Sequence, residues 1–244
     1  MLYLLRTKTS RLIFSFLFLL FFFQSFNAFS QRPLFQDDHD NKPYYFGITL
    51  AGSLSRFQTE LHSHFLEQDS IMIAEPANAG GFALGLSATL KLTNRFEARF
   101  NPQLAFMDRS IFYKLKYEER GQGTDVIKKV ESVIVSFPMQ IKFNSDRIGN
   151  FRVYMLGGGK LDYDLASNAR ARKAEELVKI QKMDYGIEAG VGFNFYFQSF
   201  IFSPEIKISN GLGNIHSRDQ NLKYSSVFDK MQSRMIVFSI HLEG

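Results

Sequence analysis

The sequence predicts an all-β fold, specifically an eight-stranded antiparallel up-and-down transmembrane β-barrel of the outer-membrane type. In residues 184–197, apolar side chains alternate with polar residues and glycine. Seven further segments repeat this period of two, and the links between successive segments are alternately long and short. A period of two marks a strand whose two faces have different surroundings. In a membrane barrel, the apolar face contacts lipid and the polar face lines the lumen.

The eight predicted strands share one pattern. Large apolar residues recur at every second position, and glycine, serine, threonine or a charged residue occupies most positions between them. The energetic cost of placing charges in lipid decides which face of each strand points inward. Turning Arg99, Lys142 or Lys207 toward the bilayer midplane would be unfavourable by about 2 to 4 kcal/mol for each residue. The strands are 44–55, 81–91, 96–107, 132–143, one that starts at Phe151, 184–197, one that starts at Phe200, and 235–243.

The links between the strands predict the orientation. Bacterial barrels have short periplasmic turns and longer outer loops. The short links are 93–94, 144–149 and 198–199, and the long links are 57–80, 118–125, 163–182 and 211–234. Both chain ends of the barrel are therefore expected on the periplasmic side.

A soluble, lipocalin-like barrel of eight strands would also alternate, with its apolar face turned inward. The interior of an eight-stranded barrel is only just wide enough for its own side chains. The chain has 27 Phe and 10 Tyr, and large apolar residues occur on every predicted strand. They would not fit inside, so the composition favours the membrane barrel.

The N-terminus predicts export. Arg6, Lys8 and Arg11 precede an apolar run at 12–23, and small residues at Ala28 and Ser30 suit signal-peptide cleavage. An uncleaved anchor is the alternative, although the run is shorter than the roughly 20 residues of a spanning helix. The predicted organisation is a signal peptide at 1–30, a polar linker at 31–42 and a barrel at 43–244. The expected location is the outer membrane of a Gram-negative cell.

Charge and cysteine content exclude some functions. The formal net charge is +5, but without Arg6, Lys8 and Arg11 the chain has 26 basic and 24 acidic residues. No basic block remains, so we expect no nucleic-acid partner. The absence of cysteine excludes disulfides and thiolate chemistry.

Charged residues on the polar faces form the candidate site. Such groups persist in a confined lumen only when they are paired and hydrogen-bonded. We therefore predict a structural network of ion pairs that plugs the barrel, and a proton or ion relay is the alternative. The predicted members are Lys91, Glu97, Arg99, Lys142, Arg152, Lys160, Asp184, Glu188, Glu205 and Lys207, with Asp162 and Glu243 on the same faces.

Other patterns are weaker, and we predict no catalytic, cofactor-binding or metal-binding residues. Ser239, His241 and Glu243 share one face of the last strand, but consecutive residues along one strand do not make a hydrolase triad. Residues 170–182 have helical spacing, which suggests a short helix in an outer loop. A metal could bind Glu60, His62, His64 and Glu67, but a flexible loop rarely forms such a site by itself.

From about Lys42 onward, the chain resembles the PorT family of outer-membrane barrels. The matching segments are 96–100 with Pro102, 106–109, 130–132 with 137–138, 190–193, 202–207 and 233–235. The resemblance implies association with type IX secretion and gliding, and it carries over no catalytic residue.

The expected function is a non-enzymatic scaffold that assists protein export through the type IX system. Outer-membrane lipid and other secretion proteins are the expected partners, with no cofactor and no small-molecule substrate. Two alternatives stay open: an enzyme that modifies outer-membrane lipid, and a surface adhesion or defence barrel resembling OmpX.

Overall fold

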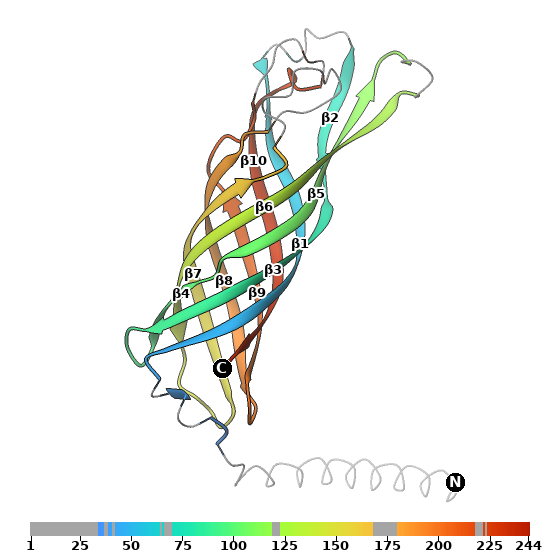
Figure 1. Ribbon diagram of the computed structural model, residues 1–244. Helices are drawn as coiled ribbons and strands as arrows, with labels where there is room; N and C mark the ends of the chain where they lie inside the picture. The colour runs from blue at the N-terminus through green and yellow to red at the C-terminus, as the bar shows by residue number, and fades with distance from the viewer. Residues whose placement is uncertain are drawn as a thin grey trace, which may run out of the picture. The chain divides into compact units, whose positions relative to one another are not determined.

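A computed structural model describes residues 34–36, 39–40, 42–63, 65, 70–118, 123–167, 180–217, 222 and 224–244. These residues form ten strands in one antiparallel sheet (Figure 1). The strands are β1 (Tyr44–Leu61), β2 (Ile71–Ala77), β3 (Ala79–Lys91), β4 (Phe96–Phe100), β5 (Gln103–Leu115), β6 (Asp125–Asn144), β7 (Phe151–Asp164), β8 (Met183–Tyr196), β9 (Ile201–Gly211) and β10 (Phe228–Glu243). Within these residues, no helix is long and apolar enough to cross a bilayer.

The ten strands make an eight-stranded barrel because two barrel strands are interrupted. β2 and β3 are two parts of one barrel strand, since both pair with β5. β4 and β5 are two parts of the next barrel strand, since each pairs with β3 on one side and with β6 on the other. The second interruption falls at Asn101 and Pro102, since proline has no N–H to give to a ladder. Pairing of β1 with β10 closes the sheet. The predicted fold class is confirmed.

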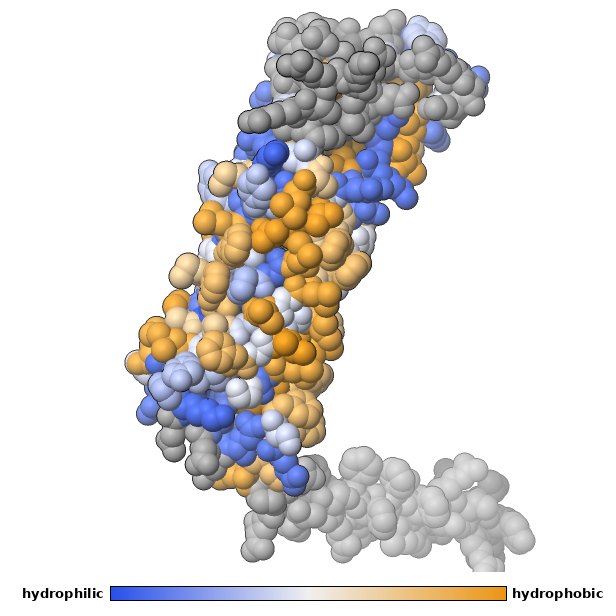
Figure 2. Space-filling view, viewed as in Figure 1, coloured by the Kyte–Doolittle hydropathy of each residue, from blue (hydrophilic) through white to orange (hydrophobic). Residues whose placement is uncertain are grey.

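An apolar belt crosses the face of the barrel seen in Figure 2, and exposed apolar side chains occur on the other barrel strands as well. Side chains such as Leu86 and Met139 are 63% and 69% exposed, although they lie in the middle of long strands. Aromatic pairs flank the belt, with Phe96 against Phe143 near the short turns and Phe82 against Phe106 nearer the long loops. Polar side chains point inward on the same strands and are buried. This arrangement matches a lipid-facing wall with aromatic girdles at both interfaces.

Beyond the belt, the strands continue farther than predicted. The predicted loop at 57–80 contains the end of β1 and all of β2, and β6 and β10 each start seven residues before their predicted first residues. The prediction failed there because the pattern inverts: apolar side chains now point inward and polar ones outward. Water replaces lipid outside this part of the barrel. The strands here therefore bury their apolar side chains and expose their polar ones, as strands of a soluble protein do.

The inverted section encloses its own apolar core at the long-loop end. Tyr113 is fully buried there and donates a hydrogen bond to the carbonyl of Tyr224 at 3.0 Å. This outer core closes the lumen on that side. Its buried members are Phe57, Ile71, Ala74, Ile111, Tyr113, Leu115, Val126, Val130, Ile180, Ile215, Tyr224, Val227, Phe228 and Met231.

The opposite end carries the short turns and the C-terminus (Figure 1). The described part of the predicted linker packs here, and residues from Phe35 to Gly244 form one compact unit. The signal peptide at 1–30 and most of the predicted helix at 170–182 lie outside the described residues.

Candidate functional site

Inward-facing side chains from the barrel strands fill the lumen with charged and aromatic groups. Strand alternation places them there, and the small residues between them make room for long side chains. At Gly192, for example, an added methyl group would lie 2.3 Å from the ring of Tyr154 on the paired strand. Seven of the ten predicted network residues form ion pairs within the lumen, with an ammonium or guanidinium close to a carboxylate.

Nearest the short turns, Lys142 stands between two carboxylates. Its Nζ lies 3.4 Å from Glu97 Oε2 and 3.9 Å from Glu243 Oε2. The hydroxyl of Tyr45 donates to Glu97 at 2.8 Å, and the ammonium lies 4.3 Å from the ring centroid of Tyr154. Lys142 is completely buried, so these contacts replace its lost hydration.

The middle of the lumen centres on Arg99 and Glu205. Arg99 Nη2 lies 2.5 Å from Glu205 Oε2, and both side chains are completely buried. The hydroxyl of Tyr154 donates to the same oxygen at 2.9 Å, and His241 Nε2 lies 3.5 Å from it. His241 Nδ1 lies 2.9 Å from the hydroxyl of Thr49. Side chains from three other strands thus converge on the Glu205 carboxylate.

Gln140 connects this centre to a second ion pair. It accepts from Arg99 Nε at 2.9 Å and donates through Nε2 to Glu188 at 2.6 Å. Glu188 in turn lies 3.2 Å from Lys207 Nζ. Two ion pairs are therefore bridged by one neutral amide, which fixes their relative positions.

Two further ion pairs lie toward the outer core. Lys160 Nζ is 2.6 Å from Asp162, which also accepts from Ser136 at 2.5 Å. Arg109 Nη2 is 4.0 Å from Asp164. A cavity of about 30 Å³ beside Lys160 and Lys207 has room for about two water molecules, so side chains fill the lumen at this level.

Three predicted residues depart from this arrangement. Arg152 pairs with Asp40 at 3.2 Å, and Lys91 donates to the carbonyl of His39; both contacts are made at the short-turn end. Asp184 is only partly buried, and it has no ion-pair partner among the described residues. These residues border the network without joining its centre.

The segment before β1 docks onto the short-turn end. The ring of His39 is 3% exposed and packs against Tyr45 and Tyr196, with centroids 4.5 and 6.1 Å apart. Arg147 contacts the carbonyl of Phe35 and lies 3.3 Å from Asp40. Residues expected to be a linker therefore cover the inner mouth of the barrel.

Sequence reasoning missed several members of the network. The sequence pattern does not include Arg109 and Asp164, because the predicted strand ends at Met107 and a predicted loop begins at residue 163. Both continue the inward phase of their strands, which is the signal that identifies them. Asp40 carried no such signal, because it lies outside any strand.

The alternative sites gain no support from the geometry. Ser239, His241 and Glu243 face the lumen and are at most 1% exposed, away from lipid. His241 contacts Thr49 and Glu205 rather than Ser239. In the described part of the chain, no three His, Asp or Glu residues are grouped to hold a metal; His64 and Glu67 lie outside it.

Comparison with solved structures gives small outer-membrane barrels. Neisserial surface protein A shares 10% identity at a TM-score of 0.43 and covers 81% of this chain and 96% of its own. OprG from Pseudomonas aeruginosa shares 15% identity at a TM-score of 0.44, and the match covers 81% of this chain and 94% of OprG. Ail of Yersinia pestis, in complex with the heparin analogue sucrose octasulfate, shares 13% identity at a TM-score of 0.39. The match covers 83% of this chain and all of the Ail chain. No curated protein matches the chain.

A family model assigns the chain more directly. The model described as outer membrane protein beta-barrel domain matches residues 29–217, well over half of the sequence. The match agrees with the closed sheet and the apolar belt, and it places that belt in contact with membrane lipid. The protein therefore belongs to the outer membrane protein beta-barrel domain family.

Proposed function

We propose that this barrel is a non-catalytic scaffold that assists protein export to the cell surface through the type IX secretion system. The observation that carries the proposal is the filled lumen. Buried ion pairs cross it at several levels, the outer core closes one end and the segment before β1 covers the other. Such a barrel offers its wall and its two ends to partners, and the side chains that the structure describes block the passage of solutes through the lumen.

The choice of the type IX system rests on the sequence resemblance to the PorT family. Its segments fall on the wall and in the lumen of the barrel: residues 96–100 are β4, and residues 202–207 lie within β9. The resemblance supports a role beside other secretion proteins.

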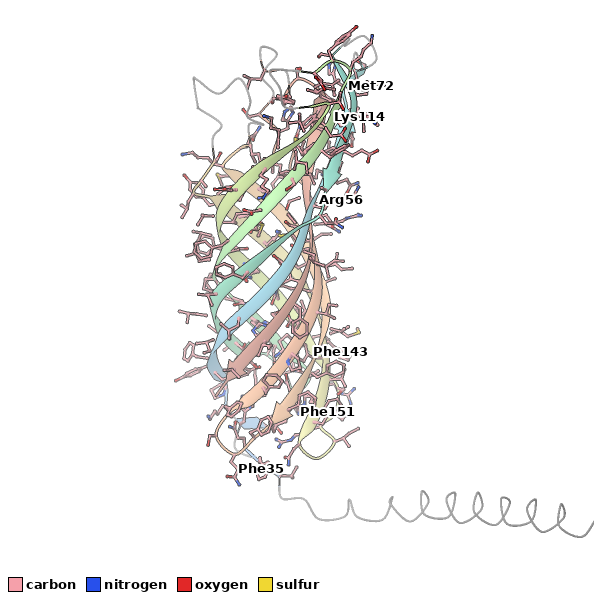
Figure 3. The ribbon with its side chains drawn as sticks, turned by 90° about the vertical axis from the view of Figure 1, so that its right-hand side faces the viewer. Phe35, Arg56, Met72, Lys114, Phe143 and Phe151 are labelled. Atoms are coloured by element: carbon pink, nitrogen blue, oxygen red, sulfur yellow. The ribbon has the colours of Figure 1, made fainter. Side chains whose placement is uncertain are left out.

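A surface adhesion or defence role is the second candidate, because one observation favours it. β2, β5 and β6 extend beyond the belt, where Met72 and Ile127 are 57% and 62% exposed (Figures 1 and 3). An exposed apolar group on a projecting sheet suits contact with a surface or another protein.

Deletion of the gene distinguishes these functions. We expect loss of type IX cargo from the cell surface, measured by surface proteomics, with unchanged lipid A acylation and attachment. A change in attachment alone supports adhesion, and altered lipid A with normal export supports a lipid-modifying enzyme. Normal export in the deletion strain contradicts the proposal.

Complementation separates a scaffold from a proton or ion relay. The double variant Glu188→Gln, Lys207→Met removes one lumen ion pair while keeping Gln140 in contact with a polar group. We expect this variant, once its folding is confirmed by heat-dependent gel mobility, to restore export as the wild-type gene does. A folded variant that fails to restore export supports the relay.

A further inference from the structure

Two arginines oppose each other on the outer wall, just above the apolar belt. Arg56 on β1 and Arg234 on β10 are direct cross-strand partners, and both side chains are exposed (Figure 3 labels Arg56). Like charges that face each other across a strand pair are destabilising. We propose that these two guanidiniums bind the phosphate of a glycolipid in the outer leaflet.

The height of the pair in the membrane fits a lipid headgroup. Along β1, the outward residues from Phe46 to Leu54 are apolar or glycine, and Arg56 is the first outward charge. On β10, the outward residues from Leu242 to Ile236 are apolar, and Arg234 is again the first charge. Twelve residue steps from Tyr44 to Arg56 span roughly 30 Å along the barrel axis for a strand tilted by about 40°, slightly more than an apolar band of about 25 Å.

Neither guanidinium is neutralised by the residues that the structure describes. Arg234 Nε donates to Asn210 Oδ1 at 3.1 Å, which fixes the side chain without changing its charge. Within the described residues, no carboxylate lies at ion-pair distance from Arg56 or Arg234. By contrast, Lys230, farther out on β10, has its own partner in Glu60 at 3.3 Å.

The arginines line a groove that a headgroup can enter. The groove has a volume of about 430 Å³, and Gln58 and Thr59 lie on the same wall with further hydrogen-bonding groups. One carboxylate, Glu75, is also part of the lining. The groove opens beside the arginines, where a phosphate would accept from both guanidiniums.

Arginine suits phosphate because its planar donors match two oxygens at once. A phosphate between the two side chains would also remove their mutual repulsion. Acyl chains attached to that phosphate would lie directly below, against Leu54 and Ile236, which are 63% and 49% exposed. A free phosphate would gain none of this apolar contact, so the geometry points to lipid A, the phosphorylated glycolipid of the outer leaflet.

Native mass spectrometry of the mature protein in detergent tests the site. The probes are bisphosphorylated lipid A, the same lipid after enzymatic dephosphorylation, and inorganic phosphate as a competitor. We expect the wild-type protein to bind the phosphorylated lipid at least about tenfold more tightly than the dephosphorylated lipid. The double variant Arg56→Gln, Arg234→Gln should lose this preference.

The matched control is Lys114→Gln, Lys129→Gln, which removes two exposed positive charges from the same end of the barrel. It should keep the preference. Arg56→Lys, Arg234→Lys should keep part of the preference, because lysine keeps the positive charge but lacks the planar donors that bind two phosphate oxygens at once. Heat-dependent gel mobility establishes that each variant is folded. Equal binding by the folded glutamine variant and the wild type overturns the proposal, as does displacement of the lipid by millimolar inorganic phosphate.

Discussion

Replacing Arg99 by methionine should lower the free energy of unfolding by about 3 to 5 kcal/mol. The change leaves Glu205 completely buried without its guanidinium partner, and a buried charge that loses its partner is strongly destabilising. Glu205→Met should have a similar effect because it leaves the buried guanidinium of Arg99 without its carboxylate partner. Urea titration of the protein in lipid vesicles measures both.

The double variant Arg99→Met, Glu205→Met should recover most of the loss, since the two unpaired charges are removed together. Arg95→Gln provides the control, because Arg95 and Asp146 form an ion pair on the surface, where such pairs contribute about 0 to 1 kcal/mol. Single Arg99 and Glu205 variants as stable as Arg95→Gln would show that the lumen pair does not hold the barrel together.

Acidification should release the segment before β1 from the short-turn end. Burial, reinforced by the positive charge of Lys91, lowers the pKa of His39 from 6.5 to about 4, although Glu243, Glu97 and Asp40 oppose the shift. The docked segment therefore holds neutral His39, and the released segment binds a proton more readily. This contribution to docking, about 3 kcal/mol, is fully present above pH 6.5 and is lost as the pH falls through 4.

At pH 5 the docking equilibrium should be weaker by about 30-fold than at neutral pH. Phe35→Trp introduces the only tryptophan of the chain, and quenching by acrylamide reports its release. In the background of His39→Phe, which cannot titrate, the pH dependence between 7 and 5 should disappear. The same increase in quenching with His39→Phe would assign the transition to another group.

The sequence was sufficient to predict the barrel because membrane alternation is strict where lipid contacts the wall. Residues 184–197 predicted β8 almost to its ends, and the inward placement of Arg99 and Lys142 followed from the cost of the opposite register. The strand extensions were not predicted, because outside the belt the pattern inverts and the same residue types carry the opposite meaning. Phe57 is an example, since it continues β1 but points inward.

The partners within the lumen were beyond sequence reasoning for a different reason. Alternation tells which face a residue occupies, but the height at which two strands meet across the barrel depends on their stagger. Arg99 and Glu205 are 106 positions apart and come from walls that do not pair with each other. The docked segment had no periodic signal at all, because His39 and Asp40 contact the barrel from outside the sheet.

Spin labels on β8 test most directly whether apolar side chains face lipid and charged ones face the lumen. The chain has no cysteine, so single cysteines can be introduced without background. In vesicles, labels at Ile187, Val191 and Phe193 should collide frequently with oxygen and rarely with a water-soluble nickel complex. Labels at Glu188 and Asn194 should be shielded from oxygen. Equal oxygen accessibility at all five positions, or a reversed alternation, would contradict the lipid-facing wall and the lumen network with it.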